Sequence, residues 1–175
     1  MKVLLVSATY QEIAPFVERL EDKVVQNNLH SGKLNSQEID CLITGIGINA
    51  ATYALTKYLQ DNKYDLVINA GIAGCYNDTL PIGTVVVVKS DCFADLGIDD
   101  NGTFRTVFEE KLADSDEFPF LNGLLQNNPE LPFVSGLQEV KGITVNTASG
   151  SKERIRFLKE KFNPDIKYNR TVVRG

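Results

Sequence analysis

The sequence predicts an α/β protein with a largely parallel sheet, and three observations lead to this class. Apolar strand-like runs alternate along the chain with segments of helical periodicity, as they do in βαβ units. Most of these strand-like runs end in a turn of small residues. The run over residues 83–89 contains an unbroken series of valines, which is typical of a strand covered on both faces.

The chain opens with a predicted strand over residues 2–7, followed by a predicted helix. Thr9, with Glu12 three residues later, has the pattern of a capping box, which is a common way to start a helix. The apolar residues that follow are spaced as they would be on one buried helical face. That face consists of Ile13, Phe16, Val17 and Leu20.

Two more predicted strands follow, with a helix between them. The first lies within residues 35–44 and ends at Gly45 and Gly47. The second covers residues 65–70 and ends in the small-residue segment 71–74. Glycines at these ends permit tight turns of the backbone. The buried face of the helix between the strands is predicted to contain Ala50, Ala51, Ala54, Leu55 and Leu59.

The pattern weakens between residues 91 and 132, where Asp, Asn, Gly and Pro recur. We expect an excursion with one or two short helices there, rather than a second domain. A strand over residues 138–146 and a helix opened by Gly150 and Ser151 complete the predicted elements. Because no linker, repeat or charge block interrupts the chain, residues 1–175 are predicted to form a single domain.

Charge and apolar content exclude several classes of function. The net charge is −5, and the 18 Lys and Arg residues are scattered instead of forming a stripe, so we expect no nucleic-acid partner. No apolar run is long enough to cross a bilayer, and the N-terminus lacks the pattern of a signal peptide. These features predict a cytoplasmic protein with no membrane partner.

The histidine and cysteine content argues against a metal site and against a catalytic triad. The one histidine, His30, lies in a polar stretch that we interpret as a surface turn. Cys41, Cys75 and Cys92 are widely spaced and form no Cys-x-x-Cys pair, so reduced thiols are expected instead of disulfides or a zinc site. A serine nucleophile on a Gly-x-Ser-x-Gly elbow is also absent from the sequence.

The glycine-rich turns do not match the common nucleotide-binding fingerprints. Gly45 and Gly47 could begin a dinucleotide turn, but Ala50 stands where the third glycine would be. The Gly-Lys-Ser/Thr of a phosphate-binding Walker loop is absent as well. These glycines by themselves therefore fit any α/β protein.

Three strand ends carry residues that could have either a catalytic or ligand-binding role or a purely structural one. Glu12 could complete a capping box or direct a carboxylate at a ligand. The segment 69–74 could let a flat ligand lie on the backbone, or it could be an ordinary glycine-rich turn. The segment 144–151 could hydrogen-bond the edge of a heterocycle, or it could cap the next helix through Ser149 or Ser151.

Taken in order, these segments resemble the nucleoside phosphorylase/nucleosidase family. The resemblance covers residues 1 to about 166 and rests on KVLLVSATYQE, TGIGINAA, DLVINAGIAGCYNDTLPIGTVVVV, DCFADLG and GITVNTASGS. Within the family, FADLG and TVNTASGS resemble the branch that hydrolyses futalosine in an alternative menaquinone pathway. Several motifs in the right order are much more specific than any one of them.

The resemblance implies a three-layer α/β/α fold with a mixed, largely parallel central sheet. It also implies hydrolysis of the N-ribosidic bond of futalosine with release of hypoxanthine, without a metal or organic cofactor. The alternatives are another purine nucleosidase, such as a methylthioadenosine/adenosylhomocysteine nucleosidase, and a catalytically inactive protein that only binds a purine or nucleoside. A homodimer is expected by analogy alone.

The resemblance further implies roles for individual residues. Glu12 stands at the place of the glutamate that activates the attacking water. Asn69 and Ile72 stand where phosphorylases of the family carry an arginine and a serine that hold phosphate, so hydrolysis is favoured over phosphorolysis. The residues expected to bind substrate are Ala8, Gly47, Asn69, Gly71, Ile72, Ala73, Gly74, Asn146, Thr147, Ala148 and Ser149.

Residues 167–175 do not match the family. After the part that matches Ile166, the family continues into a strand with a glutamate that binds the ribose hydroxyls. A later strand carries the aspartate that protonates the purine. We therefore expect the C-terminal strands and helix of the fold to be lacking, with their catalytic carboxylates, through a frameshift near Lys167 or a truncation.

Overall fold

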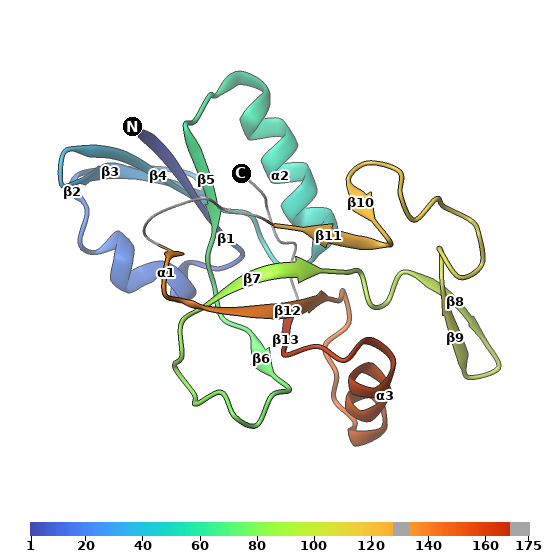
Figure 1. Cartoon of the computed structure of the whole chain (residues 1–175). Helices are drawn as coiled ribbons and strands as arrows, with labels where there is room; N and C mark the ends of the chain where they lie inside the picture. The colour runs from blue at the N-terminus through green and yellow to red at the C-terminus, as the bar shows by residue number, and fades with distance from the viewer. Residues whose placement is uncertain (128–133, 169–175) are drawn as a thin grey trace. The chain divides into compact units, whose positions relative to one another are not determined.

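The computed structural model describes residues 1–127 and 134–168, and these fall into two compact units that divide between Ile72 and Ala73 (Figure 1). Helices and parallel strands occur in both units, and both large sheets are mixed. The predicted α/β class is thereby confirmed. The expectation that residues 1–175 form a single domain stays a prediction.

A five-stranded sheet forms the centre of the first unit. Its strands are β1 (Lys2–Ser7), β2 (Glu21–Gln26), β3 (Leu29–Leu34), β4 (Gln37–Ile43) and β5 (Leu66–Asn69). Their order in the sheet is β2-β3-β4-β1-β5. The parallel strand β1 lies between β4 and β5, so that Val6 has Leu42 on one side and Asn69 on the other. The strands predicted at the positions of β1, β4 and β5 are therefore present.

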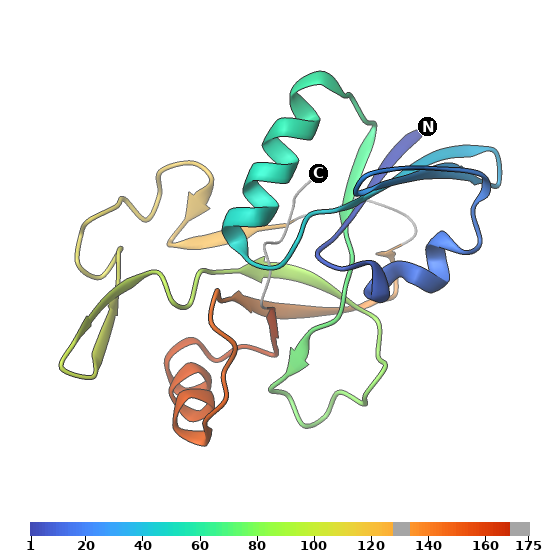
Figure 2. The same ribbon diagram turned by 180° about the vertical axis from the view of Figure 1, so that it is seen from behind.

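Helices cover both faces of this sheet and give the first unit three layers, α/β/α (Figure 1 and, from behind, Figure 2). The helices are α1 (Tyr10–Val17) and α2 (Ile48–Asp61). Successive side chains of a strand point to opposite faces of a sheet. Accordingly Leu5 packs on the α1 side, whereas Leu4 packs on the α2 side with Leu55.

The hairpin of β2 and β3 has no counterpart among the predicted strands, and it shows that the turn predicted at His30 is wrong. His30 lies within β3, is half-buried, and has its ring centroid 5.0 Å from that of Tyr10. All residues of β2 are exposed. The strand therefore lacks the alternation of apolar and polar residues from which a half-buried strand is predicted. The turn uses Asn27 with a φ of 55°, a conformation that asparagine tolerates.

A buried carboxylate connects α2 to the sheet of the first unit. Asp40 of β4 accepts hydrogen bonds from the hydroxyls of Tyr58 and Tyr64. The Lys2 ammonium lies 3.6 Å from the same carboxylate oxygen. Burial by itself acts to raise the pKa of Asp40, but these contacts and a hydrogen bond from Ser31 outweigh it and hold the pKa below its usual value.

The lowered pKa of Asp40 predicts a specific loss of stability in acid. Because the folded pKa lies below the unfolded value of 3.8, the contribution of Asp40 is present above that pH and is lost as the pH falls through the folded pKa. The Asp40→Asn variant should therefore lose stability relative to wild type at about pH 7, with a smaller difference at about pH 3. Urea denaturation at both pH values measures this. Asp61→Asn, at an exposed position of α2, is the matched control and should show no such convergence.

A six-stranded mixed sheet forms the centre of the second unit. Its strands are β6 (Gly74–Cys75), β7 (Val86–Asp91), β10 (Phe120–Leu121), β11 (Leu124–Gln126), β12 (Gln138–Thr144) and β13 (Ile166–Tyr168). Their order is β10-β11-β7-β12-β13-β6, with β12 parallel to both β7 and β13. Helix α3 (Lys152–Phe162) covers one face, where its Leu158 is fully buried with Ile143. The Ser151 hydroxyl caps this helix by accepting a 3.1 Å hydrogen bond from the backbone N–H of Arg154.

The excursion after β7 contains β-hairpins in its described residues, so the prediction of short helices is wrong there. Strands β8 (Gly97–Asp100) and β9 (Thr103–Thr106) pair antiparallel. Asn101 and Gly102 join them with φ values of 49° and 83°. Positive φ at both central residues is the requirement of the tight hairpin turn for which Asn-Gly is the preferred sequence. Residues 128–132 of the excursion lie outside the described residues.

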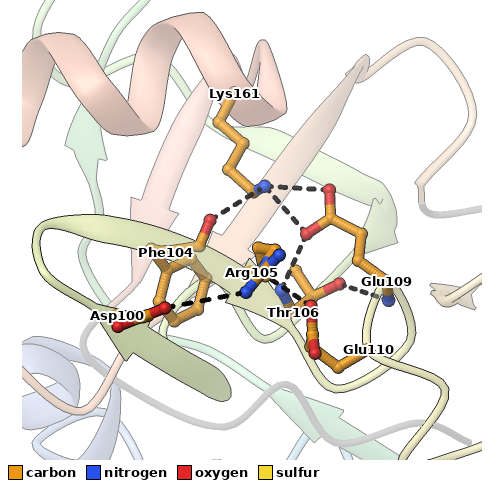
Figure 3. A network of polar contacts seen from close by, with 7 residues as sticks. All are labelled: Asp100, Phe104, Arg105, Thr106, Glu109, Glu110 and Lys161. Carbon is orange, nitrogen blue, oxygen red and sulfur yellow. Dashed lines mark hydrogen bonds and ion pairs between the residues drawn. The ribbon is translucent and has the colours of Figure 1, made fainter.

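A polar network joins this hairpin to α3 (Figure 3). The Lys161 ammonium lies 2.8 Å from both carboxylate oxygens of Glu109 and donates to the carbonyl oxygen of Phe104 at 3.3 Å. Arg105 forms a second ion pair, of 2.7 Å, with Glu110. The hydrogen bond from Lys161 is the main cause that lowers the pKa of Glu109. The network therefore holds the hairpin against the last turn of the helix.

The segment that we expect not to match the family, residues 167–175, begins inside β13. Lys167 is paired with Ile143 of β12 on one side and with Gly74 of β6 on the other. Residues 169–175 lie outside the described residues. Within the described part of the chain, no helix combines the length and the apolar character needed to cross a membrane.

Candidate active site

The carboxyl ends of the parallel strands β4, β1 and β5 meet at one edge of the first unit's sheet. The backbone N–H groups of Thr44 and Gly45 donate to the carbonyl oxygens of Ser7 and Ala8, at 2.9 and 3.1 Å. On the other side of β1, the N–H of Ala70 donates to Val6. Ligands of open α/β sheets bind outside such strand ends. This edge is therefore the first place to look for chemistry.

Glu12 has its carboxylate at this edge, held by three donors from two strand ends. Its Oε2 accepts hydrogen bonds from the Ser7 hydroxyl at 3.0 Å and from the Thr9 backbone N–H at 3.3 Å. Its Oε1 accepts one from the backbone N–H of Ile72 at 3.3 Å. Thr9 and Glu12 thus form the predicted capping box, while the second oxygen reaches the turn after β5. The structural role and a chemical role of Glu12 are compatible.

The other predicted residues of the first unit lie at the same edge of the sheet, after β1, β4 and β5. Ala8 is buried directly after β1, and Asn69 is half-buried as the last residue of β5. Gly71 and Ile72 follow in an exposed turn. Gly47 is the N-cap of α2 and has a φ of 95°. Glycine adopts this backbone conformation at little steric cost, because it has no Cβ atom. The structure therefore gathers these residues at the ends of three adjacent parallel strands.

The remaining predicted residues belong to the second unit. Ala73 and Gly74 are exposed and lead into β6. Asn146, Thr147 and Ala148 are exposed in the loop after β12, and Ser149 is half-buried in the same loop. We call residues 146–149 the β12 loop. Its polar groups stand at the carboxyl end of a parallel strand, which is the position expected for ligand contacts.

The carboxyl ends of β7 and β12 are bound to each other by buried polar contacts. The Thr144 hydroxyl donates to the Asp91 carboxylate at 2.6 Å, and both residues are buried. The Thr144 N–H donates to Cys92, and its carbonyl accepts from the N–H of Ala94 at 2.9 Å. The segment after β7 therefore stays beside the end of β12 instead of leaving the sheet.

Asp95 follows in this segment and contacts the β12 loop directly. Its Oδ2 accepts hydrogen bonds from the backbone N–H groups of Asn146 at 2.7 Å and of Thr147 at 3.1 Å. A carboxylate that accepts two successive backbone N–H groups fixes the direction in which the loop leaves the strand.

Sequence reasoning missed Ser7 and Asp95. Ser7 is fully buried at the last position of β1, where a polar residue in an apolar strand was an available signal. Asp95 lies in the FADLG segment, which contributed to the family resemblance, but the sequence analysis assigned no role to its carboxylate. The partners of Asp95 lie at another strand end and became clear only from the fold, whereas Ser7 contacts Glu12, five residues further along the chain.

The described residues offer few groups for metal or thiol chemistry. They contain no cluster of three or more His, Cys, Asp or Glu side chains that could hold a metal ion. Burial raises the pKa of the Cys41 thiol and of the Cys92 thiol to about 12. These thiols therefore stay protonated and unreactive near neutral pH.

Sequence comparison finds relatives that share much of the chain. A family model described as "Phosphorylase superfamily" matches residues 2–135. The 5'-methylthioadenosine/S-adenosylhomocysteine nucleosidase of Buchnera aphidicola subsp. Schizaphis graminum is 28% identical over an alignment of 145 residues, which covers 71% of this chain and 62% of the relative. The enzyme of the same name from Maridesulfovibrio salexigens is 34% identical over 92 residues, 50% of this chain and 39% of the relative. The chain thus spans less than two thirds of the length of these curated relatives.

Solved structures of the same fold cover nearly the whole chain. The Campylobacter jejuni 5'-methylthioadenosine/S-adenosyl homocysteine nucleosidase has a TM-score of 0.76 at 19% identity, covering 98% of this chain and 76% of that one. A futalosine hydrolase mutant of Helicobacter pylori has a TM-score of 0.74 at 18% identity, covering 97% of this chain and 77% of that one. These likenesses confirm the predicted nucleoside phosphorylase-like fold.

Proposed function

The chain belongs to the phosphorylase superfamily, and from this premise we propose that it hydrolyses the N-ribosidic bond of a purine nucleoside, with futalosine as the first candidate substrate and hypoxanthine as the product. The observation that carries the proposal is the carboxylate of Glu12, held at the meeting point of parallel strand ends by Ser7, Thr9 and Ile72. In the proposed reaction Glu12 accepts a proton from a water molecule that attacks C1′ of the ribose. Positive charge builds on the sugar as the bond to the purine lengthens, as in glycoside hydrolysis, and the purine leaves with the electron pair of that bond and takes up a proton.

The residues beside Glu12 favour water over phosphate as the nucleophile. Binding a phosphate needs cationic side chains or free N–H donors. The strand end 66–74 contains neither Lys nor Arg. The backbone N–H of Ile72, which could have served an anion, donates to Glu12 instead. These features support hydrolysis rather than phosphorolysis.

The purine base is proposed to bind to the β12 loop. Thr147, Ala148 and Ser149 match the family segment that contacts the base, and small polar residues suit the edge of a heterocycle. Ala8, Gly47, Asn69 and the turn 71–74 are proposed to contact the nucleoside, and the alanines and glycines among them allow the ligand to approach the backbone closely. Ordered donors placed in advance could each contribute a few kcal/mol to lowering the barrier.

The choice of futalosine rests on the segments FADLG and TVNTASGS and is supported by the fold shared with the Helicobacter pylori futalosine hydrolase. A methylthioadenosine/adenosylhomocysteine nucleosidase is the second candidate, because the curated relatives carry that name. The two candidates differ in the base released, which is hypoxanthine from futalosine and adenine from the others.

A chromatographic assay of base release by the 175-residue chain tests the proposal. Futalosine, methylthioadenosine and adenosylhomocysteine are offered separately, and both bases are quantified. Hypoxanthine from futalosine alone supports the first candidate, whereas adenine from the other two supports the second. If neither base is released but hypoxanthine binds, the chain is a purine-binding protein and the hydrolase proposal is wrong.

A homodimer in the cytoplasm completes the proposal. It rests on analogy with the family and on the absence of a membrane-crossing helix among the described residues. Light scattering after size-exclusion chromatography distinguishes a dimer from a monomer of 19.4 kDa.

A further inference from the structure

The FADLG segment places an acid beside the β12 loop for which the proposed reaction has no role. Phe93 forms a parallel bridge with Thr144, and the N–H of Ala94 donates to the Thr144 carbonyl at 2.9 Å. Ala94 is fully buried, so this part of the segment is anchored in the second unit's core. The next residue, Asp95, therefore has a fixed backbone at the point where the β12 loop begins.

The carboxylate of Asp95 acts on two successive residues of that loop. Its Oδ2 accepts from the N–H of Asn146 at 2.7 Å and from the N–H of Thr147 at 3.1 Å. Hydrogen bonds with a charged acceptor are about twice as strong as those between neutral groups. Only the backbone groups of Asn146 and Thr147 take part in these two bonds. The contact therefore orders the loop without specifying its side chains.

A contribution to fold stability does not by itself explain why a carboxylate stands at position 95. The second oxygen, Oδ1, is buried and has no hydrogen-bond donor among the described residues. A buried polar atom without a partner reduces stability. Natural proteins accept such local costs mainly at functional sites.

We infer that Asp95 is a positioning residue, which holds the β12 loop in the conformation that binds the purine base. The inference rests on the proposed function, since that function places the base at this loop. Asp95 acts through the loop backbone and needs no contact with the substrate. Its loss should weaken base binding more than it weakens the fold.

Three variants separate this role from a general effect on folding. Asp95→Ala removes both hydrogen bonds, and Asp95→Asn keeps an acceptor oxygen but removes its charge. Asp99→Ala is the matched control, because the Asp99 carboxylate also accepts a backbone N–H, that of Gly102 at 3.0 Å, but in the exposed hairpin turn. Binding of hypoxanthine and of adenine is measured by calorimetry, and hydrogen exchange of the Asn146 and Thr147 amides is measured by NMR.

Asp95→Ala should weaken binding of the preferred base at least about tenfold and speed exchange of both amides by a similar factor. Asp95→Asn should recover part of both effects while melting at or above the wild-type temperature. Asp99→Ala should change neither readout. If Asp95→Ala does not fold, the comparison of Asp95→Asn with wild type carries the test.

Unchanged base affinity in a folded Asp95→Ala variant overturns the inference and leaves the proposed function intact. Unchanged amide exchange overturns it equally, because the loop would then be ordered by other contacts. A wild-type chain that binds neither base overturns the proposed function, and the positioning role falls with it. The wild-type measurement therefore distinguishes the two failures.

Discussion

Replacing Glu12 with glutamine is expected to lower kcat for nucleoside hydrolysis about a thousandfold, the scale of losing a general base. Glutamine is nearly the same size, and its single amide oxygen can still accept the hydrogen bonds that Ser7 and Thr9 donate to one oxygen of Glu12, although it gives up the one from Ile72 to the other oxygen. It cannot take a proton from water. The affinity for the free base should stay close to that of wild type, because the change affects the reaction and leaves the β12 loop untouched.

Steady-state kinetics with the preferred nucleoside measures this loss. Glu18→Gln is the matched control, since Glu18 lies exposed at the other end of α1 and should keep full activity. Ser7→Ala should give an intermediate loss, because it removes one of the donors that orient the carboxylate. Activity of Glu12→Gln within a few-fold of wild type would show that another group activates the water, and the proposed mechanism would be wrong.

Replacing Thr144 with valine is expected to destabilise the second unit by about 3 kcal/mol, the scale of removing a hydrogen bond from a buried charged group. Valine has nearly the shape of threonine, so packing at this fully buried position is preserved. What is lost is the 2.6 Å hydrogen bond to the Asp91 carboxylate, which is itself only 2% exposed. Because the Asp91 carboxyl group is shielded from solvent, no water molecule can take the place of the lost Thr144 hydroxyl as a donor.

Urea denaturation measures the change in the free energy of unfolding. Thr144→Ser keeps the hydroxyl and removes only a methyl group, so it should retain most of the stability that valine loses. Equal losses in both variants would mean that packing, and not the hydrogen bond to Asp91, determines the stability at this position.

The sequence predicted those parts of the fold whose side chains carry an apolar period. Lys2–Ser7 is a strand at the predicted residues, because its interior is buried on both faces. Helix α3 begins where Ser151 predicted it, because a cap is a local interaction between residues close in sequence. The hairpins were missed because their strands are exposed, as all of β2 and β8 are, and exposed strands need no apolar alternation. The Asn101-Gly102 pair was nevertheless a readable turn signal.

The candidate site was predictable to the extent that it lies at the ends of predicted strands. Glu12 was identified from its place after the first strand, and the structure puts its carboxylate against the turn after β5. The contact of Asp95 with the β12 loop depends on which strands are neighbours and on their register, and register between strands distant in sequence does not follow from local patterns. Ser7 contacts Glu12 only five residues further along the chain, but no local pattern indicates that the Glu12 side chain turns back toward the end of β1.

The capping box at the start of α1 has a consequence for the reaction cycle. One oxygen of Glu12 accepts the N–H of Thr9 and thereby belongs to the helix terminus. Under the proposed mechanism this carboxylate becomes neutral each time it receives the proton of water, and a neutral acid is a weaker acceptor than its anion. Proton uptake and the tightness of the first helical turn are then thermodynamically linked, so that α1 loosens slightly with each turnover and recovers when the proton leaves.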